Sequence, residues 1–332
     1  SLLREKLCIS LEAPSDDDGA GMSPTCNAQD LSEAMPFEEG IPLAYTKGRT
    51  KIQDAHLRAV SIQQMCDLGN LVLSVLEKSP ILDPENTRKI TWFTVNIHHI
   101  NALIVKKLTQ LQGCSFVELV AAGPSEAQWY VSNWWGTPFR NTLDMLLYHA
   151  ELKGFDLLNE VYWMDAFAIN HHEASDHCSD IWNTSRIRVI RAATCRGTVM
   201  CMDPEANALT RPWCILDYHV TTKVCADEQL EKKFEVASVI EEGSQSYYEV
   251  SAQGERMRHI YQGRTAAVLS WKGQTPELNI RDKKALGLSF PRTVGRQAMS
   301  LDVASVEGDS DCAQAILRFI LGGSIRMDEP LP

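Results

Sequence analysis

Short apolar runs alternate with helical patterns through the middle of the chain. Three of these runs have the length and composition of buried strands: 129–131, 161–168 and 198–202. Apolar residues at helical spacing follow each of them, at 139–150, 187–193 and 210–224. Strands that alternate with helices are typical of a parallel sheet with helices on both faces. We therefore predict a three-layer, parallel-sheet α/β domain.

The first helix of this domain has the clearest predicted boundaries. Thr137 and Pro138 suit the cap and the first position of a helix, and Gly154 suits its end. Its apolar residues follow the helical repeat and form one stripe: Phe139, Leu143, Leu146, Leu147 and Ala150. A stripe of this kind packs on a sheet. We therefore expect at least one of the adjacent leucines in it to be buried.

Two further helical patterns precede the α/β domain. Apolar residues recur at helical spacing over 52–76 and 92–111, and Gly123-Pro124 marks a break after them. Residues 1–48 hold an acidic run, several Gly and Pro and little periodicity, as flexible segments do. The predicted organisation is a flexible leader over 1–48, a helical extension over 49–124 and an α/β domain over 125–325. The later elements of that domain are expected at 234–240, 266–271 and 313–321, as two strands and a helix.

Composition and charge narrow the functional classes. Hydrophobic residues make up 44% and charged residues 23%, near the averages of globular domains, so wholesale disorder is excluded. Lys and Arg number 32 against 43 Asp and Glu, a net charge of −11. This balance argues against a nucleic acid as the main partner, because proteins that bind one carry a basic surface. No apolar run reaches the roughly 18 residues of a membrane span.

The chain also lacks signals for export. Residues 1–30 do not show the basic and then apolar pattern of a signal peptide. Ten Cys occur without a Cys-x-x-Cys motif, which favours reduced core thiols over a disulfide framework. We expect a soluble, cytoplasmic protein. Because the first residue is Ser1, we expect the chain to be a fragment or a processed form.

Familiar catalytic and metal motifs are absent from the sequence. A loop holds His171, His172, His177 and Cys178, but zinc needs three or four converging ligands and this spacing matches no ligand pattern. We expect a polar loop there and no metal. The chain has no Gly-x-Gly-x-x-Gly, no P-loop and no Gly-x-Ser-x-Gly. Dehydrogenase, P-loop NTPase and serine hydrolase chemistry are therefore not expected.

Polar and aromatic residues gather where the predicted strands end. These ends are Ser132-Asn133-Trp134-Trp135-Gly136, Asp165 to His172, and Asp203. Ligands of parallel α/β sheets bind outside the carboxyl ends of the strands. The sequence therefore predicts a ligand site at this edge.

Three segments in order resemble Toll/interleukin-1 receptor (TIR)-like domains, most closely a divergent group from unicellular algae and protists. They are Trp129-Tyr130-Val131-Ser132-Asn133-Trp134-Trp135-Gly136, Tyr162-Trp163-Met164-Asp165-Ala166-Phe167-Ala168-Ile169-Asn170-His171-His172, and Leu209-Thr210-Arg211-Pro212-Trp213-Cys214-Ile215-Leu216-Asp217. That group commonly has Ser-His-Trp-Trp-Gly and Arg-x-Trp-Cys-x-x-Glu at the first and third of these places. The stretch 303–307 is similar to the group as well. The resemblance covers roughly 92–323 and implies a TIR or flavodoxin-like fold.

The resemblance implies one of two functions. Some TIR domains hydrolyse NAD at the nicotinamide glycosidic bond, and others self-associate and recruit further TIR domains without catalysis. The enzymatic ones place a Glu where this chain has Asp217, and Asn133 stands where the group has His. Asp is one methylene shorter than Glu, and a displacement of about 1 Å could reduce the rate roughly 100-fold. NAD is thus the expected substrate of the enzymatic reading, which needs no cofactor.

Two acids are the candidates for catalysis. Asp217 shares a helix face with Trp213, four residues before it, and a carboxylate beside the sugar would stabilise an oxocarbenium-like transition state. The alternative is that Trp213 is a core residue and Asp217 a surface or Arg-paired acid. Asp165 follows an apolar run, where burying an unbonded acid is costly. It is expected either to take part in the site or to accept hydrogen bonds from loop amides.

The remaining candidates would bind the substrate: Ser132, Asn133, Trp134, Trp135, Arg140 and Arg211. The two adjacent tryptophans either stack on a nucleobase or pack under the following helix. The two arginines either hold a diphosphate by bidentate hydrogen bonds or remain solvated. The sequence leaves both alternatives open.

Overall fold

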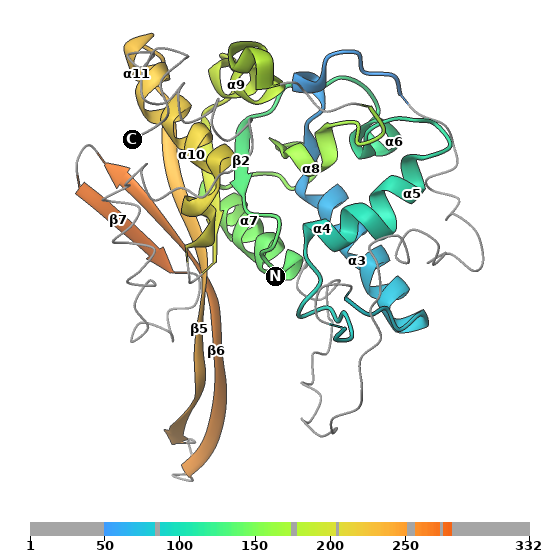
Figure 1. Cartoon of the computed structure of the whole chain (residues 1–332). Helices are drawn as coiled ribbons and strands as arrows, with labels where there is room; N and C mark the ends of the chain where they lie inside the picture. The colour runs from blue at the N-terminus through green and yellow to red at the C-terminus, as the bar shows by residue number, and fades with distance from the viewer. Residues whose placement is uncertain are drawn as a thin grey trace, which may run out of the picture.

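Seven strands form one mixed sheet within the residues that the structure describes (Figure 1). The computed structural model describes residues 50–83, 87–173, 178–203, 206–250, 256–272 and 275–280. Four neighbouring strands run parallel, in the order β3 (Val161–Trp163), β2 (Trp129–Asn133), β4 (Gly197–Met202) and β5 (Lys233–Val250). The strands at the two ends are antiparallel: β1 (Val60–Ser61) beside β3, then β6 (Arg256–Lys272) and β7 (Thr275–Ile280) beyond β5. The α/β fold is confirmed, but the sheet is mixed and not purely parallel as expected.

Helices cover both faces of this sheet. Trp129 and Val131 of β2 pack in one hydrophobic cluster with α3 and α7, whereas Tyr130 packs in another with α9 and α10. Successive strand residues point to opposite faces, so the two helix layers lie on opposite sides. The helices are α3 (Ile62–Lys78), α4 (Ile97–Ile100), α5 (Lys106–Thr109), α6 (Phe116–Val120), α7 (Phe139–Lys153), α8 (Asp165–Ala168), α9 (Ser185–Arg191), α10 (Pro212–His219) and α11 (Cys225–Asp227).

Helix α7 follows the sequence prediction closely. Its first helical residue is Phe139, with Pro138 in the cap position, one residue later than expected. Gly154 ends it with φ of 67°, in the left-handed region that glycine adopts without strain. Leu146 is fully buried and Leu147 is partly buried against the same cluster. The expectation of a buried leucine in this stripe is therefore confirmed.

The predicted strand over 161–168 is wrong in its second half. Strand β3 ends at Trp163, and Asp165–Ala168 is the short helix α8. A continuous apolar run suits a buried helix as well as a strand, so periodicity could not separate the two. The carboxylate of Asp165 accepts a hydrogen bond from the backbone N–H of Ala166, 2.7 Å away, and lies in the first turn, where an acid stabilises a helix.

Other predicted elements differ in their bounds. The helix expected over 52–76 begins only at Ile62, where Ser61 and Gln64 form a capping box. The helical patterns at 92–111 and 210–224 are each interrupted by a π-helical turn, at Asn101–Val105 and Val220–Val224. A 3-10 turn, Asn207–Thr210, precedes α10. The strands expected at 234–240 and 266–271 are parts of the longer antiparallel pair β5 and β6.

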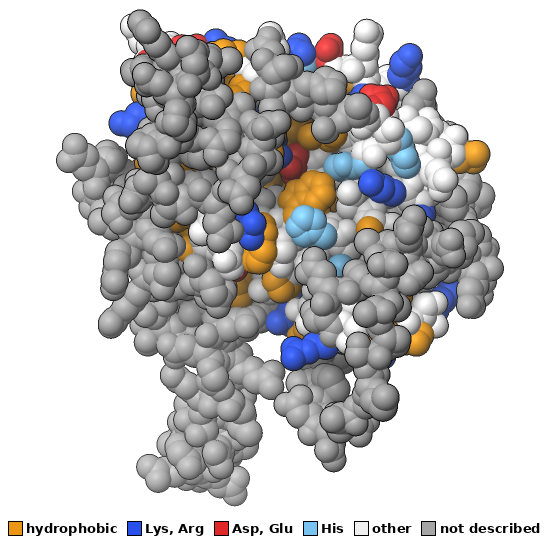
Figure 2. All heavy atoms as spheres, in the orientation of Figure 1, with side chains coloured by type: hydrophobic (Ala, Val, Ile, Leu, Met, Phe, Trp, Pro, Cys, Tyr) orange, Lys and Arg blue, Asp and Glu red, His pale blue; other side chains and the backbone are white. Residues whose placement is uncertain are grey.

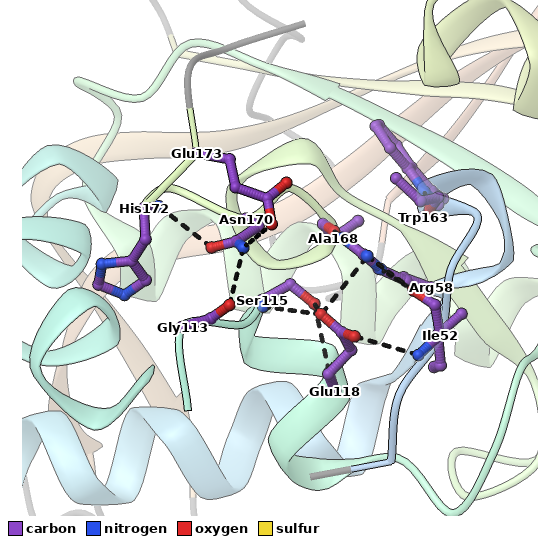
Figure 3. Close-up of polar contacts among 11 residues, drawn as sticks. Ile52, Arg58, Gly113, Ser115, Glu118, Trp163, Ala168, Asn170, His172 and Glu173 are labelled. Carbon is purple, nitrogen blue, oxygen red and sulfur yellow. Dashed lines mark hydrogen bonds and ion pairs between the residues drawn. The ribbon is translucent and has the colours of Figure 1, made fainter. Parts of the chain in front are cut away.

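The segment before residue 125 shares the core of the sheet. Figure 3 shows Arg58 between Ile52, Ala168 and Glu118. Its guanidinium donates to the carbonyl oxygens of Ile52 at 2.6 Å and of Ala168 at 3.1 Å, and lies 3.5 Å from Glu118. Glu118 also accepts from the backbone N–H of Ile52 at 3.0 Å. Strand β1 joins the sheet directly, so this segment adds to the α/β core instead of forming a separate one.

Several expectations lie outside the described residues. These are the leader over 1–48, the helix at 313–321 and the stretch at 303–307. Among the helices that are described, none has the length and apolarity that crossing a membrane requires.

Replacing Leu146 with Ala should lower the free energy of unfolding by about 2 to 5 kcal/mol, because the side chain is fully buried between α7 and the sheet. The matched variant Leu147→Ala removes the same atoms from a partly buried position and should cost clearly less. Denaturant unfolding of both variants measures the difference. Equal losses would contradict the orientation of α7.

Candidate functional site

The candidate site lies at the point where the order of the strands in the sheet reverses, between β3 on one side of β2 and β4 on the other. From β2 the chain enters β3 on one side and then returns to β4 on the other. In open α/β sheets the crevice at such a reversal, outside the carboxyl ends of the strands, is the usual ligand position. The residues that follow β2, β3 and β4 therefore meet at one edge of the sheet.

Asp217 is buried at this edge and held by two hydroxyl groups. The Tyr130 hydroxyl donates to one carboxylate oxygen at 2.9 Å, and the Ser132 hydroxyl donates to the other at 2.7 Å. Both donors lie on the same face of β2, which α10 covers. The side chain of Asp217 is only 1% exposed. The alternative of a surface acid is thus wrong, and both oxygens have partners inside the protein.

Arg186 of α9 joins the two acids that the sequence analysis singled out. Its guanidinium forms a close ion pair with Asp165 and lies 3.5 Å from Asp217. It also donates to the Tyr130 hydroxyl at 2.8 Å and lies over the ring of Trp213, 4.6 Å from its centroid. One cation thus contacts residues from α8, α10 and β2. Asp217 is therefore Arg-paired, as the structural alternative expected.

Sequence reasoning missed Arg186. The two acids predicted at this edge were a signal for it. Burying an unpaired charge is strongly unfavourable, so two buried acids require a cation near them. The segment after the second strand offers three arginines on one short helix: Arg186, Arg188 and Arg191. Only the packing of α9 shows which of them points inward.

Asp165 accepts hydrogen bonds as its structural reading expected. The indole N–H of Trp135 donates to it at 3.2 Å and the backbone N–H of Ala166 at 2.7 Å. Together with the Arg186 ion pair, these contacts place partners around both carboxylate oxygens. Asp165 is 7% exposed and anchors the Trp135 side chain at the edge.

Burial sets the protonation behaviour of this cluster. Loss of hydration raises the pKa of Asp217 from 3.8 to about 6, against the lowering effect of Arg186, Ser132 and Tyr130. Burial also raises the pKa of Tyr130 well above its ordinary value, so the phenol stays a neutral donor. Burial lowers the pKa of Arg186, but the combined charges of Tyr130, Asp165 and Asp217 raise it by more. The pKa of Arg186 therefore lies above its ordinary value. Arg186 is therefore a permanent cation.

Three tryptophans at this edge are partly exposed: Trp134, Trp135 and Trp213. The guanidinium of Arg211 lies 5.0 Å from the ring centroid of Trp134. A Cβ atom at Gly136 would lie 2.3 Å from the Trp134 ring, so any larger residue would displace this ring. Figure 2 shows hydrophobic side chains beside histidines on the face in view, with acidic and basic side chains close to them.

Trp135 contacts two histidines from different segments. Its ring centroid lies 5.4 Å from that of His98 and 5.6 Å from that of His171. The ring also packs partly against the hydrophobic cluster under α7, while Trp213 packs partly against the cluster on the other face. Trp135 therefore packs partly under α7, as one of the two alternatives expected, and its ring is also partly exposed.

The structure brings together only part of the expected site. Ser132, Asp165, Trp135, Trp213 and Asp217 belong to the cluster around Arg186. The other four candidates are Asn133, Trp134, Arg140 and Arg211, and the guanidinium of Arg211 lies against the Trp134 ring. Arg140 lies over the ring of Phe93, 4.3 Å from its centroid, and Asn133 is 8% exposed at the end of β2.

The histidine loop makes hydrogen bonds within the protein. The Nε2 atom of His171 lies 2.9 Å from the carbonyl oxygen of Ala166, and that of His172 lies 2.8 Å from the Thr109 hydroxyl. His177 lies outside the described residues. Across the described part of the chain, no three His, Cys, Asp or Glu side chains converge to hold a metal ion.

No protein-family model, curated protein or solved structure matches this chain significantly. The geometry of the edge is therefore the observation that bears on function.

Replacing Arg186 with Met should lower the free energy of unfolding by about 3 to 5 kcal/mol, because it leaves two buried carboxylates without their cation. The control is Arg188→Met. Arg188 is about half exposed and lies 3.6 Å from the carboxylate of Asp54, which is also about half exposed. Its replacement should change the free energy of unfolding by less than about 1 kcal/mol. Denaturant unfolding at neutral pH measures both. Similar losses in the two variants would show that Arg186 has no special role.

Asp217 should make the protein less stable as the pH rises from about 4 to about 6. The folded protein holds this proton up to about pH 6, whereas the unfolded chain releases it near 3.8, so a rising pH favours unfolding between these values. The contribution is fully present below this range and lost above it, about 3 kcal/mol in total. Unfolding of the wild type and of Asp217→Asn across this range isolates the effect. A stability difference that is independent of pH would contradict it.

Proposed function

We propose that this chain is a TIR-like domain that binds NAD or a related nucleotide at the carboxyl edge of β2, β3 and β4 and leaves its glycosidic bond intact. Two features support the fold assignment. The parallel strands, numbered in chain order, follow the spatial order 2-1-3-4, which flavodoxin-like folds share. The three motif segments that resemble TIR-like domains all reach this edge.

The observation that carries the absence of catalysis is the state of Asp217. In an enzymatic TIR-like site the acid at this position has to reach the ribose. Here it is 1% exposed, and Tyr130 and Ser132 take both of its oxygens. The shorter side chain of Asp favours this inward arrangement, since it keeps the carboxylate close to α10. Asp217 then acts as the counter-charge that holds Arg186.

Nucleotide binding is supported by the chemistry of the side chains at the rim of this edge, which are Trp134, Trp135, Trp213 and Arg211. The partly exposed indole rings offer flat apolar surfaces on which a nucleobase or a nicotinamide ring stacks. Arg211 lies over Trp134 and supplies a positive charge beside an aromatic surface. Rings and anionic groups in close succession are the features of a nucleotide that this rim complements. Signalling by self-association or with other TIR-like domains remains part of the proposal, carried by the resemblance alone.

Hydrolysis of NAD is the second candidate function. It is favoured by the position of Asp217 beside Trp213 and Ser132 at the edge where ligands of α/β sheets bind. For this reaction the acid would have to leave the hydroxyls of Tyr130 and Ser132 and turn toward the ribose. A ligand that supplies the energy for this rearrangement would make the site catalytic.

Binding should be tested by titrating NAD into the purified protein in a calorimeter. We expect Trp135→Ala to weaken binding about 10-fold, because stacking on one aromatic side chain contributes about 1 to 3 kcal/mol. Trp135→Phe should retain most of the affinity, since it keeps an aromatic face. The control is Trp182→Ala, which removes a partly exposed tryptophan that contacts Arg191 instead. No binding to the wild type, with folding verified by thermal unfolding, would overturn the proposal.

Nicotinamide release from NAD decides between binding and hydrolysis. We expect no release by the wild type or by Asp217→Asn, and no loss of NAD binding in Asp217→Asn beyond a few-fold. Asp217→Glu tests whether a longer side chain carries the carboxylate past the Tyr130 and Ser132 hydroxyls and so produces nicotinamide release. Turnover by the wild type that Asp217→Asn abolishes would establish the hydrolase and refute the catalytically silent reading.

A further inference from the structure

Residues 92–98 lie across the loop between β2 and α7 and reach the first turn of α7. We call this segment the strap. The backbone N–H of Ile97 donates to the carbonyl oxygen of Trp135 at 3.0 Å. In the other direction, the N–H of Phe139, the first residue of α7, donates to the carbonyl oxygen of Val95 at 2.8 Å. The strap is therefore hydrogen-bonded to both the loop and the helix.

Aromatic side chains of the strap extend this contact. The guanidinium of Arg140 lies over the ring of Phe93, 4.3 Å from its centroid. The ring of Trp92 meets that of Phe139 edge to face, with centroids 6.5 Å apart. Phe93 and Trp92 are both partly exposed. The first turn of α7 is thus covered by side chains as well as by backbone.

The strap takes a place that α/β sheets commonly give to an anion. Helix α7 follows β2 at the point where the strand order reverses, and helix N-termini at such points bind phosphate groups through their unpaired N–H groups. Here Pro138 has no N–H, and the N–H groups of Asn141 and Thr142 donate to its carbonyl oxygen at 2.9 and 3.2 Å. The N–H of Phe139 is bonded to the strap, so it reaches an anion only if the strap moves.

Buried polar atoms near the same turn have no hydrogen-bond partner among the described residues. The hydroxyl of Thr137 is one of them, on a residue that is 1% exposed and directly precedes Pro138. The side-chain oxygen of Asn133, at the end of β2, is another, on a residue that is 8% exposed. Buried polar groups are almost always paired in native proteins, and an exception calls for a partner such as an ion or a ligand group.

We propose that the strap closes an anion site at the start of α7, with Phe93 as its latch, and that its release exposes this site to a phosphate group. In the released state a phosphate oxygen replaces the Val95 carbonyl as the acceptor of the Phe139 N–H. The Thr137 hydroxyl supplies a second donor, and the positive end of the α7 dipole favours the same charge. The inference rests on the proposed nucleotide binding for the source of the phosphate, and not for the closed site itself.

The helix that follows the strap offers a physical route for its release. Helix α4 begins within the strap, and the π-helical turn Asn101–Val105 separates it from α5. Such turns hold one extra residue and are frequent at functional sites. Return of this turn to α-helical pairing would shift the strap by about 1.5 Å, the rise of one residue. The buried side chains of Val95 and Ile97 keep the strap closed when no ligand is bound.

The test loosens the latch and follows anion binding in the full chain. We expect the amide hydrogen of Phe139 to exchange at least about 10-fold faster in Phe93→Ala than in the wild type, because its acceptor is released. Inorganic pyrophosphate and NAD should each bind about 3- to 10-fold more tightly to this variant, and adenosine, which has no phosphate, should bind equally to both proteins. Thr137→Val added to Phe93→Ala should remove the gain, because it deletes the second donor.

A matched control is available in the same domain. Phe155→Ala also removes a partly buried phenylalanine that lies under an arginine, Arg196, 5.2 Å from the ring centroid, but it lies beyond the other end of α7. It should change neither the exchange of Phe139 nor the affinity for pyrophosphate. Thermal unfolding verifies that each variant is folded, and Phe93→Leu, which keeps apolar bulk without the ring, replaces Phe93→Ala if that variant unfolds.

The outcomes separate this inference from the proposal on which it rests. Unchanged exchange at Phe139, or unchanged or weaker pyrophosphate binding in Phe93→Ala, would show that the strap only supports the fold and would overturn the inference. An equal gain with and without the Thr137 hydroxyl would assign the gain to Arg140 and overturn it as well. If the variant gains pyrophosphate but neither protein binds NAD, the closed site stands and the proposed nucleotide binding fails. If both proteins bind NAD and pyrophosphate equally well, nucleotide binding stands and the closed site is refuted.

Discussion

One guanidinium connects the elements that build the edge of the sheet. Arg186 of α9 bridges Asp165 at the start of α8 and Asp217 on α10, and it also donates to Tyr130 on β2. Each of these groups would be costly to bury alone, because hydration favours their charged forms. Together they constrain where α8, α9 and α10 lie. Two tryptophans of the rim are positioned by this network, since Trp135 donates to Asp165 and Trp213 lies under Arg186.

The same network limits what the site can do chemically. A carboxylate that stabilises a developing positive charge has to be free to approach the sugar. Asp217 instead has both oxygens occupied, and its burial raises its pKa to about 6. The charge that an enzyme would direct toward a ligand is directed here toward Arg186. This is the physical reason for separating the proposed nucleotide binding, which would use the rim, from glycosidic cleavage, which would use the buried acid.

The segment before residue 125 takes part in the site as well as in the fold. It supplies β1 to the sheet, the buried contacts of Arg58 and Glu118 to the core, and His98 to the surroundings of Trp135. Its helices α4, α5 and α6 have only four or five residues each, so they depend on packing against the rest of the domain for their stability. The position of this segment relative to the site is fixed, because it packs on the sheet and pairs with it through β1.

Much of the fold could be read from the sequence. Alternating apolar runs and helical stripes predicted β2, α7 and β4 nearly at their observed positions, because local hydrophobic periodicity reflects which face each element buries. The edge that holds Asp165, the tryptophans and Asp217 was also predicted, since parallel strands present their carboxyl ends together. The antiparallel direction of β6 was not, because an apolar run has the same appearance in either direction.

Tertiary structure alone decided the state of the site. Nothing in the local pattern distinguishes Arg186 from Arg188 or Arg191, which differ only in the direction that the packing of α9 gives them. At the change from strand to helix, the Asp165 carboxylate accepts hydrogen bonds from Ala166 and from Trp135, which lies 30 residues away in the sequence. His98 and His171 both contact Trp135 only because segments distant in the sequence pack against the same loop. Sequence by itself placed Ser132, Asp165 and Asp217 at one edge of the sheet. Long-range packing determined which of them are buried, paired and able to meet a ligand, because burial and pairing depend on neighbours that the local sequence does not specify.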